Sequence, residues 1–409
     1  MLVRRLVGFC VVFLLMAGGS VLVATRDTRA DNHGHAMRGR FEGPSASSGI
    51  ECLTMRGRKT WCERDSQLDG EEGLVISPDG RNAYKAPVPP DPDFELSILF
   101  IYDRDPATGS LVQKSGPQGC ISAQPRPDCQ TDRRLNNIGG PSVSPDGTNV
   151  YVNSREVLTI FDRDPATGDL TQKPGDAGCV TFLPDTRVKG CGRLPVGGSP
   201  ALVFSPDGKN AYFSTAKALV GLDRDPTTGA LAPVPGGRIN GFGISPVIVS
   251  PDGKNVYAFK GTDYKDDFQL NTFTRDPETG ALSRVSAPGG CISEKGARGC
   301  RYGRAISRGF LIGSPDGKNL YAANGVYDDG YLLTFDRLPD GTLVQKRGSA
   351  GCISVEPNHE GCRVRGGLGI SSPKGLGIGL DGKTVFDEGL YELGDPTLFA
   401  RHPSGRLSR

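Results

Sequence analysis

Histidine is scarce in this sequence, with four residues in 409. His33 and His35 precede the repeats described below, which leaves His359 and His402 as candidates for catalysis. Neither lies in a motif with a serine or cysteine nucleophile, and no Gly-x-Ser-x-Gly elbow occurs. The sequence therefore offers no recognisable catalytic triad, and its catalytic residues stay unknown.

The sequence has no long stretch free of glycine and proline, which number 58 and 31. This excludes a helical bundle and favours many short strands joined by turns.

An excess of charge of one sign is also absent. Net charge is +2, and removal of residues 1–30 leaves 44 basic residues against 45 acidic ones. Because basic stretches are short and not interleaved with aromatics, we expect no nucleic-acid partner.

The only long apolar run lies at the N-terminus, over 6–24, behind Arg4 and Arg5. A small residue at Ala30 offers a cleavage point, so 1–30 is predicted to be a secretory signal peptide. An uncleaved membrane anchor is the alternative. Residues 31–47 then form a disordered linker, and 48–409 form one domain. The expected location is secreted or in the cell envelope, with membrane contact only if the segment stays uncleaved.

The number and spacing of the cysteines also indicate a secreted or cell-envelope location. Apart from Cys10, ten cysteines fall in five close pairs, which predict local disulfides in an exported chain. A zinc site needs four ligands at one point, and these pairs lie tens of residues apart with almost no histidine between them. The pairs are Cys52 with Cys62, Cys120 with Cys129, Cys179 with Cys191, Cys291 with Cys300, and Cys352 with Cys362.

Two motifs repeat along the chain in alternation. The tetrapeptide Ser-Pro-Asp-Gly starts at Ser77, Ser144, Ser205, Ser250 and Ser314, with a worn copy at 379–382. A second motif, such as the Asp-Arg-Asp-Pro-Ala-Thr-Gly at 103–109, follows each copy. The aspartates of the first motif are spaced by 67, 61, 45, 64 and 65 residues. The shortest unit lacks cysteines, so we expect each unit to begin with an inserted cysteine loop before a basic module of about 45 residues.

The sequence pattern of each repeat unit predicts four strands. A short apolar run such as 246–249 suits an innermost strand buried on both faces, and Pro-Asp-Gly then forms a tight turn. The second motif ends the third strand in a hairpin turn. Four antiparallel strands at this period indicate an all-β fold, a β-propeller of six four-stranded blades with disulfide-closed loops on one face. Seven blades are the alternative. A closed ring has no free edge, so we expect a monomer.

The repeat resembles that of the lactonase-type β-propellers, whose best-known enzyme hydrolyses 6-phosphogluconolactone. The residues that carry the resemblance are Ser-Pro-Asp-Gly-Lys-Asn-Val-Tyr at 250–257 and Arg-Asp-Pro-Glu-Thr-Gly-Ala-Leu at 275–282. The Gly-Cys-Ile-Ser loops look like those of a secreted, cysteine-bearing branch. The resemblance spans roughly 48–409 and implies the fold. It places no catalytic residue on this chain, because no stretch matches an active-site motif, and the family enzyme is seven-bladed.

The repeated polar residues have structural explanations. An aspartate in a tight turn, such as Asp146, is predicted to accept backbone N–H groups. Neighbouring pairs such as Asp162 and Arg163 are predicted to pair weakly on the surface. A tyrosine recurs at one repeat position, from Tyr84 to Tyr321, and is predicted to pack between blades.

The connections between second and third strands are acidic and should emerge on the same face as the cysteine loops. The low-priority candidates for a ligand or metal site are Asp263, Asp266, Asp267, Asp328 and Asp329. Carboxylates near a propeller axis offer oxygen ligands for Ca²⁺, although solvated loops are the favoured interpretation and no cofactor is required. The leading functional hypothesis is a scaffold that binds an unidentified protein or small molecule. The alternatives are a lactone hydrolase working at the central channel and a structural propeller of the cell envelope.

Overall fold

The computed structural model describes the residues of 52–408 except for the following segments. These are 54–61, 64–73, 87–96, 155–156, 183–187, 195, 198–200, 244–245, 262–267, 287, 295, 297–298, 308, 327–328, 356–360, 365–372, 379–381 and 390–396. Almost all regular structure is β. In the described part of the chain the exceptions with printed bounds are the 3₁₀ turns η2 (Gly116–Gln118), η3 (Gly175–Ala177) and η5 (Gly348–Ala350). Within the described residues, no helix has the length and apolar character needed to cross a membrane.

The strands form six sheets of four to six strands, in chain order. The first sheet holds β3 (Leu74–Ile76), β4 (Asn82–Lys85), β5 (Ile98–Arg104), β6 (Leu111–Gln113), β7 (Cys120–Ser122) and β8 (Gln130–Thr131). The second holds β9 (Pro141–Val143), β10 (Asn149–Asn153), β11 (Val157–Arg163), β12 (Leu170–Gln172), β13 (Cys179–Thr181) and β14 (Gly192–Arg193). The third holds β15 (Val203–Phe204), β16 (Asn210–Ser214), β17 (Ala218–Arg224) and β18 (Leu231–Asn240).

The second half of the chain repeats this arrangement. The fourth sheet holds β19 (Val247–Val249), β20 (Asn255–Lys260), β21 (Gln269–Arg275), β22 (Leu282–Arg284), β23 (Cys291–Ser293) and β24 (Arg301–Tyr302). The fifth holds β25 (Gly309–Gly313), β26 (Asn319–Val326), β27 (Asp329–Arg337), β28 (Leu343–Gln345), β29 (Cys352–Ser354) and β30 (Arg363–Val364). The sixth holds β31 (Pro373–Ile378), β32 (Thr384–Gly389), β33 (Thr397–Arg401) and β34 (Leu407–Ser408). A separate parallel pair, β1 (Cys52–Leu53) and β2 (Cys62–Glu63), precedes them.

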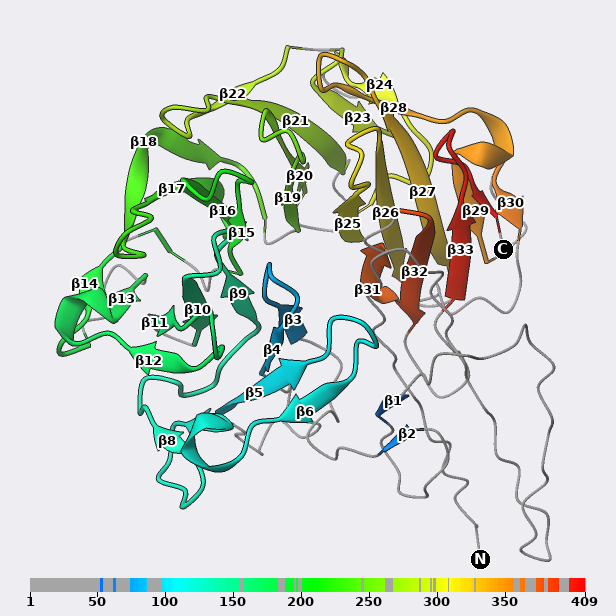
Figure 1. Ribbon diagram of the computed structural model, residues 1–409. Coiled ribbons are helices and arrows are strands. Elements are labelled where there is room, and N and C mark those ends of the chain that lie inside the picture. The colour runs from blue at the N-terminus through cyan, green and yellow to red at the C-terminus, as the bar shows by residue number, and fades with distance from the viewer. Residues whose placement is uncertain are drawn as a thin grey trace, which may run out of the picture.

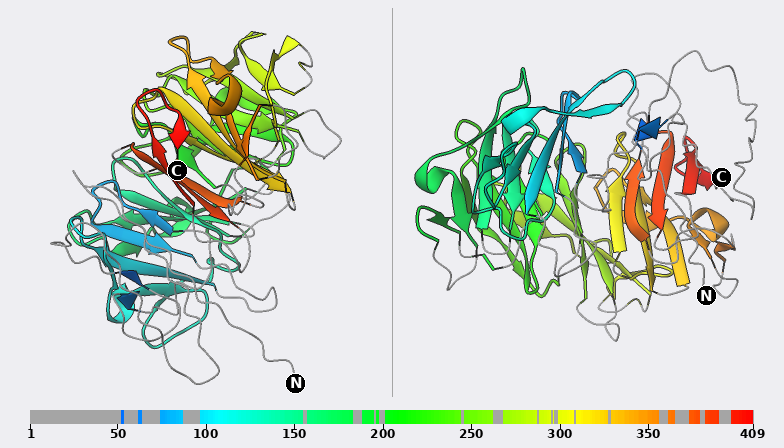
Figure 2. Two further views of the ribbon diagram at one scale, coloured as in Figure 1. Left: turned by 90° about the vertical axis from the view of Figure 1, so that its right-hand side faces the viewer. Right: turned by 90° about the horizontal axis from the view of Figure 1, so that it is seen from below.

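The sheets follow one another around a common centre, toward which the first strand of each sheet lies (Figure 1). Seen from below, neighbouring sheets stand side by side with their strands running in similar directions (Figure 2). Apolar side chains fill the space between neighbouring sheets. Tyr84 and Ile101 of the first sheet, for example, belong to one buried cluster with Val150 and Phe161 of the second. The fold is therefore the predicted all-β propeller.

Five of the described inner strands, those of the first five sheets, end in the predicted Ser-Pro-Asp-Gly turn. In the second sheet, Ser144 Oγ donates to Asp146 Oδ1 at 2.6 Å and accepts the N–H of Asn149 at 3.0 Å. Asp146 Oδ1 also accepts the N–H of Thr148 at 3.1 Å. Gly147 has a φ of 70°, in the left-handed region that glycine adopts without steric cost. The prediction that these aspartates satisfy turn N–H groups is confirmed.

The cysteine loop belongs to the sheet that precedes it in the chain. In the first sheet, β5 pairs with β6 through Arg104 and Leu111, and with β7 through Phe100 and Cys120. Strand β8 then lies outside β7 and parallel to it. The prediction that each unit begins with its cysteine loop is wrong, because the loop forms the outer edge of the sheet already built.

The cysteine-free third sheet shows what has been inserted. Its outer strand β18 is continuous and runs the length of β17, with a bulge between Val220 and Leu222. Arg238 lies opposite Val220 there, as Cys179 lies opposite Thr159 in the second sheet. The first cysteine strand is thus the second half of an outer strand. Only the residues after it are an addition to the module.

Candidate functional site

The repeated arginines join neighbouring sheets. Arg224 is buried in the third sheet and reaches the second, where its Nη1 lies 2.7 Å from Asp146 Oδ2. Its Nε donates to the hydroxyl of Tyr151 at 2.9 Å, and its Nη2 donates to Asn149 Oδ1 at 2.7 Å. The Tyr151 hydroxyl donates in turn to the carbonyl of Gly229 at 2.7 Å. We call this set of contacts the inter-sheet network.

The same network recurs at five interfaces. The arginine, tyrosine and aspartate are Arg163 with Tyr84 and Asp79, Arg224 with Tyr151 and Asp146, Arg275 with Tyr212 and Asp207, Arg337 with Tyr257 and Asp252, and Arg401 with Tyr321 and Asp316.

The predicted surface pairing of neighbouring Asp and Arg residues is therefore wrong. Arg163 is buried and binds Asp79 of the first sheet, while Asp162 lies next to Lys173 instead. A buried guanidinium needs acceptors for all of its N–H groups, and its chain neighbour in a strand points to the opposite face. The signal that was missed is that arginine, tyrosine, asparagine and aspartate recur together at matched repeat positions.

Burial fixes the protonation of the network. Burial raises the pKa of Tyr151 to about 12, although Arg224 opposes the rise. Burial also acts to raise the pKa of Asp146, but hydrogen bonds from Ser144, Arg224 and Thr148 outweigh it and hold that pKa at about 2. Such groups do not exchange protons near neutral pH, where general acid–base catalysis operates. The network is structural.

The described strands nearest the centre carry no carboxylate and no histidine. Strands β3, β9, β15, β19, β25 and β31 contain apolar, glycine, proline and serine residues, with Lys374 as the one charged residue. Carboxylates and histidines are the side chains that most often activate water, so on this chain such groups would have to come from outside these strands.

The proposed acidic site falls largely outside the described residues. Asp263, Asp266, Asp267 and Asp328 lie there, and Asp329 is described only by its backbone, which pairs with Val326 at the start of β27. Among the described residues, no three histidine, cysteine, aspartate or glutamate side chains gather as a metal site would require. The described residues leave untested both the favoured interpretation of these connections as solvated loops and its alternative, a calcium site.

Four predicted disulfides are present: Cys120–Cys129, Cys179–Cys191, Cys291–Cys300 and Cys352–Cys362. Each joins residues 9 to 12 apart, with Cα atoms separated by 4.8 Å. The fifth pair is described by its backbone, in which Cys52 lies opposite Cys62 across β1 and β2. Four disulfides are consistent with an extracytoplasmic location.

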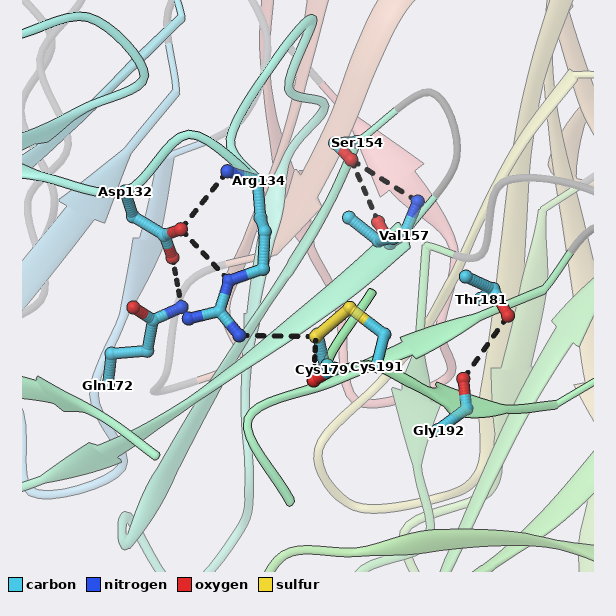
Figure 3. The surroundings of a disulfide bond; sticks show 10 residues. Asp132, Arg134, Ser154, Val157, Gln172, Cys179, Thr181, Cys191 and Gly192 are labelled. Atoms are coloured by element: carbon cyan, nitrogen blue, oxygen red, sulfur yellow. Dashed lines mark hydrogen bonds and ion pairs between the residues drawn. A yellow bond between two sulfur atoms is a disulfide. The ribbon is translucent and has the colours of Figure 1, made fainter. Parts of the chain in front are cut away.

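The segment that follows one cysteine loop packs on the outer edge of the next sheet. After the first loop, Arg134 Nη1 donates to Cys179 Sγ at 3.1 Å, and its Nε donates to Asp132 at 3.0 Å (Figure 3). Gln172 of the second sheet donates to the other carboxylate oxygen of Asp132. Arg304 occupies the corresponding place on the fifth sheet, where its backbone N–H donates to Gln345 at 2.7 Å.

The first sheet has a hollow at this position. The hollow has a volume of 410 Å³ and lies beside the Cys120–Cys129 disulfide. Ile98 and Phe100 line it together with the polar side chains of Gln113, Lys114 and Arg126.

Exposed apolar side chains occur in two matched groups. Tyr302 in β24 is 68% exposed and Val364 in β30 is 41% exposed, each one residue after an arginine on the outermost edge of its sheet. Val112 in β6 and Val344 in β28 are exposed as well, on the strands that follow the hairpin turns. Tyr302 and Val364 each lie two residues after a disulfide-bonded cysteine, whereas Val112 and Val344 do not.

No protein-family model matches the chain, and no curated protein sequence matches it. Among solved structures, the chain is similar to a protein from Bacteroides uniformis provisionally named a 6-phosphogluconolactonase, with a TM-score of 0.50 and 18% identity over 82% of both chains. A Bacteroides fragilis protein with the same provisional name has a TM-score of 0.50 and 16% identity, again over 82% of both chains. At these identities the likeness shows the fold alone, which is that of a lactonase-like β-propeller.

Proposed function

We propose that this chain is an extracytoplasmic β-propeller scaffold that binds a protein or small-molecule partner and has no catalytic turnover. The observation that carries the proposal is the exposure of Tyr302 and Val364 on edge strands next to disulfides. Tyrosine is enriched at the energetic centres of interfaces. A disulfide reduces the conformational entropy that such residues lose on binding.

The inter-sheet network supports a scaffold because it uses the repeated charged residues. Arg224 and its counterparts have their donors engaged between sheets, and the turn aspartates are paired with them. Because these repeated charged residues are engaged between sheets, recognition of a partner would use the sheet edges and the loops instead.

Hydrolysis of a sugar lactone is the second candidate, favoured by the lactonase-like fold and by the provisional names of the two similar structures. The reaction would need a carboxylate or a cation near the central channel to activate water. On this chain, Asp266 and Asp267 of an acidic connection would be the source.

A structural propeller held in the cell envelope by an uncleaved N-terminus is the remaining candidate. N-terminal sequencing of the mature chain tests it, and a start near Asp31 would exclude the anchor.

Lactone turnover tests catalysis directly. Oxidised protein spanning 31–409 is incubated with gluconolactone and 6-phosphogluconolactone between pH 5 and 9, and acid release is followed by titration. We expect no release above the protein-free blank. Turnover by the unmodified protein that is lost in the D266N/D267N variant would contradict the scaffold hypothesis and support the lactone hydrolase.

Site-specific photocrosslinking tests the binding surface. A photoreactive residue replaces Tyr302 in one variant and Val112 in a matched control, since both positions are exposed. We expect an adduct of defined mass in the extracytoplasmic fraction from position 302 and none from position 112. Equal labelling from both positions would contradict a specific surface at the edge of β24.

A further inference from the structure

One described disulfide has an arginine in contact with its sulfur. Arg134 follows the first cysteine loop, and its Nη1 donates to Cys179 Sγ of the second sheet at 3.1 Å (Figure 3). Among the described residues, no other cysteine sulfur accepts a hydrogen bond from an arginine. A neutral sulfur is a weak acceptor, so this contact gains strength when the sulfur carries a charge. The Cys179–Cys191 bond therefore differs chemically from the other described disulfides.

A carboxylate holds the guanidinium in this place. Asp132 Oδ1 accepts the Nε–H and the backbone N–H of Arg134, each at 3.0 Å. The other oxygen of Asp132 accepts from Gln172 of the second sheet. The side chain of Asp132 is 5% exposed and that of Arg134 is 23% exposed. Because Asp132 binds Nε, Nη1 is left to face the sulfur, and a positive charge is fixed beside Cys179 in advance.

The two sulfurs of this disulfide differ in accessibility. Cys179 is fully buried in β13, whereas Cys191 is half-buried just before β14. Gly190, which precedes Cys191, has open space where a Cβ would be. A small molecule can therefore reach the sulfur of Cys191 from outside the sheet, but not that of Cys179.

We propose that Cys191 is a modification site for low-molecular-weight thiols, with Cys179 as the leaving group and Arg134 as the residue that stabilises it. The thiolate of the small molecule attacks Cys191 Sγ and forms a new S–S bond there. The bond between Cys179 and Cys191 breaks, and its electron pair stays on Cys179 Sγ, which becomes a thiolate beside the guanidinium. The small thiol is oxidised to the mixed disulfide while Cys179 is reduced, so no other reactant is needed.

The guanidinium favours the modified state in both directions of the exchange. It offsets the cost of a charge on the buried Cys179, and a sulfur that is more stable as a thiolate leaves faster. The same contact weakens the return attack by Cys179, because the nucleophilicity of a thiolate falls as it is stabilised. The carbonyl of Gly190 lies 3.4 Å from the same sulfur, but it belongs to the loop that the exchange releases.

The edge of the second sheet keeps its hydrogen bonds through the exchange. Strand β14 pairs in parallel with β13, with Val180 opposite Gly192 and Thr181 opposite Arg193. Thr181 Oγ1 also donates to the carbonyl of Gly192 at 3.2 Å (Figure 3), and the N–H of Leu194 donates to the carbonyl of Thr181 at 2.8 Å. Since none of these bonds involves sulfur, the exchange opens the loop without detaching the strand.

The fifth sheet offers a matched disulfide without the sulfur contact. Cys352 is fully buried and Cys362 is half-buried, so the accessibility of the two sulfurs is the same as in the second sheet. Arg304 lies on this sheet as well, but its Nη2 donates to the carbonyls of Lys346 at 3.1 Å and Gly348 at 2.9 Å. A comparison of the two disulfides therefore isolates the contact between guanidinium and sulfur.

Exchange kinetics test the site. The oxidised protein reacts with excess glutathione, free thiols are trapped with iodoacetamide at timed intervals, and peptide mass spectrometry locates each label. We expect glutathione on Cys191 and the trapping label on Cys179, formed at least about threefold faster than the corresponding products of Cys352–Cys362. Glutathione on Cys179, or a rate at Cys191 no higher than that at Cys362, would overturn the proposal.

Substitution of Arg134 tests the leaving group. R134Q removes the guanidinium, and the matched control R133Q removes the charge of the neighbouring exposed arginine. We expect R134Q to slow the modification of Cys191 at least about threefold and R133Q to leave its rate unchanged. A substitution that only loosened the sheet would raise the rate, so the direction of the change separates the two roles of Arg134. An unchanged or raised rate in R134Q contradicts the assignment.

The freed thiol gives a second readout that does not depend on exchange. In C191S, Cys179 is left as a thiol, and its charged form is measured by the ultraviolet absorbance of the thiolate. At pH 7 we expect at least about threefold more thiolate in C191S than in C191S/R134Q, because the guanidinium favours the charged form. Equal thiolate absorbance in the two variants would show that Arg134 does not stabilise the leaving group.

Discussion

Arg224 in the third sheet binds the hydroxyl of Tyr151 in the second sheet at 2.9 Å, although 73 residues separate them in the chain. The guanidinium also binds Asp146, Thr148 and Asn149 of the second sheet and the carbonyl of Gly208 in its own. Because its donors meet acceptors, the cost of removing a charge from water is offset. The contact ties two repeats together, and it repeats around the fold.

Tyr151→Phe removes the hydroxyl that links Arg224 to Gly229. The ring stays, so packing is retained while a buried donor and a buried acceptor lose their partner. We expect the free energy of unfolding to fall by about 1–3 kcal/mol, as measured by urea denaturation. Tyr302→Phe, at a residue that is 68% exposed, is the control and should change little. Equal effects of the two variants would argue against the network.

Alkaline pH should weaken the same contacts. Burial raises the pKa of Tyr151 from its ordinary value of 10 to about 12. The contribution of the neutral phenol to stability is therefore complete below pH 10 and is lost as pH rises toward 12. Each such tyrosine contributes about 2–3 kcal/mol over that interval. Tyrosinate absorbance and circular dichroism should change together in this range, and ionisation of all tyrosines near pH 10 without unfolding would contradict the assignment.

Acid should act through the carboxylates. The pKa of Asp146 is held at about 2, below its usual 3.8. The stabilisation due to its charge is thus complete above about pH 4 and is lost as pH falls toward 2. Asp146→Asn should lower stability at pH 7 and reduce the loss of stability between pH 4 and 2. The control is Glu278→Gln, which removes one exposed charge. An unchanged acid profile in the Asp146 variant would count against its pairing with Arg224.

Gly229→Ala should destabilise the interface between the second and third sheets. Gly229 has a φ of 71°, and an added Cβ would lie 2.5 Å from Asn149 Oδ1. Both the backbone strain and the clash oppose alanine, so we expect a loss of more than about 1 kcal/mol. Gly236 has a similar φ of 74° with open space around it, and Gly236→Ala separates backbone strain from the clash. Losses of the same size in the two variants would show that the contact with Asn149 contributes nothing.

Calcium is expected to leave thermal stability unchanged. The described carboxylates of the network already bind arginine, and no group of three metal-ligating side chains occurs among the described residues. Unfolding is followed by circular dichroism with excess Ca²⁺ and then with a chelator. A rise in Tm that the chelator reverses would show binding to the folded state, and would assign a cation to the acidic connections around Asp266 and Asp267.

The sequence predicted the local features of the fold well. Turns such as the one at Ser144 and disulfides such as Cys179–Cys191 depend on residues close in the chain, so spacing was enough. The sheet that the Cys179 strand joins and the sheet that Arg163 contacts depend on pairing between residues distant in the chain. The motif spacing is compatible with a cysteine loop that belongs to the preceding sheet or to the following one. It is likewise compatible with Arg163 paired to its neighbour Asp162 or to Asp79 of another sheet. Placement of the acidic connections was beyond the sequence as well, because their positions relative to the axis depend on loop conformation.

The short span of every described disulfide has a consequence for oxidative folding. Because each bond closes within one sheet and its partners are 9 to 12 residues apart, oxidation during the export that we propose can proceed repeat by repeat. A nascent repeat offers its own second thiol before the cysteines of the next repeat arrive. Mispaired bonds between repeats would then be rare, and the chain would depend little on disulfide isomerases during maturation.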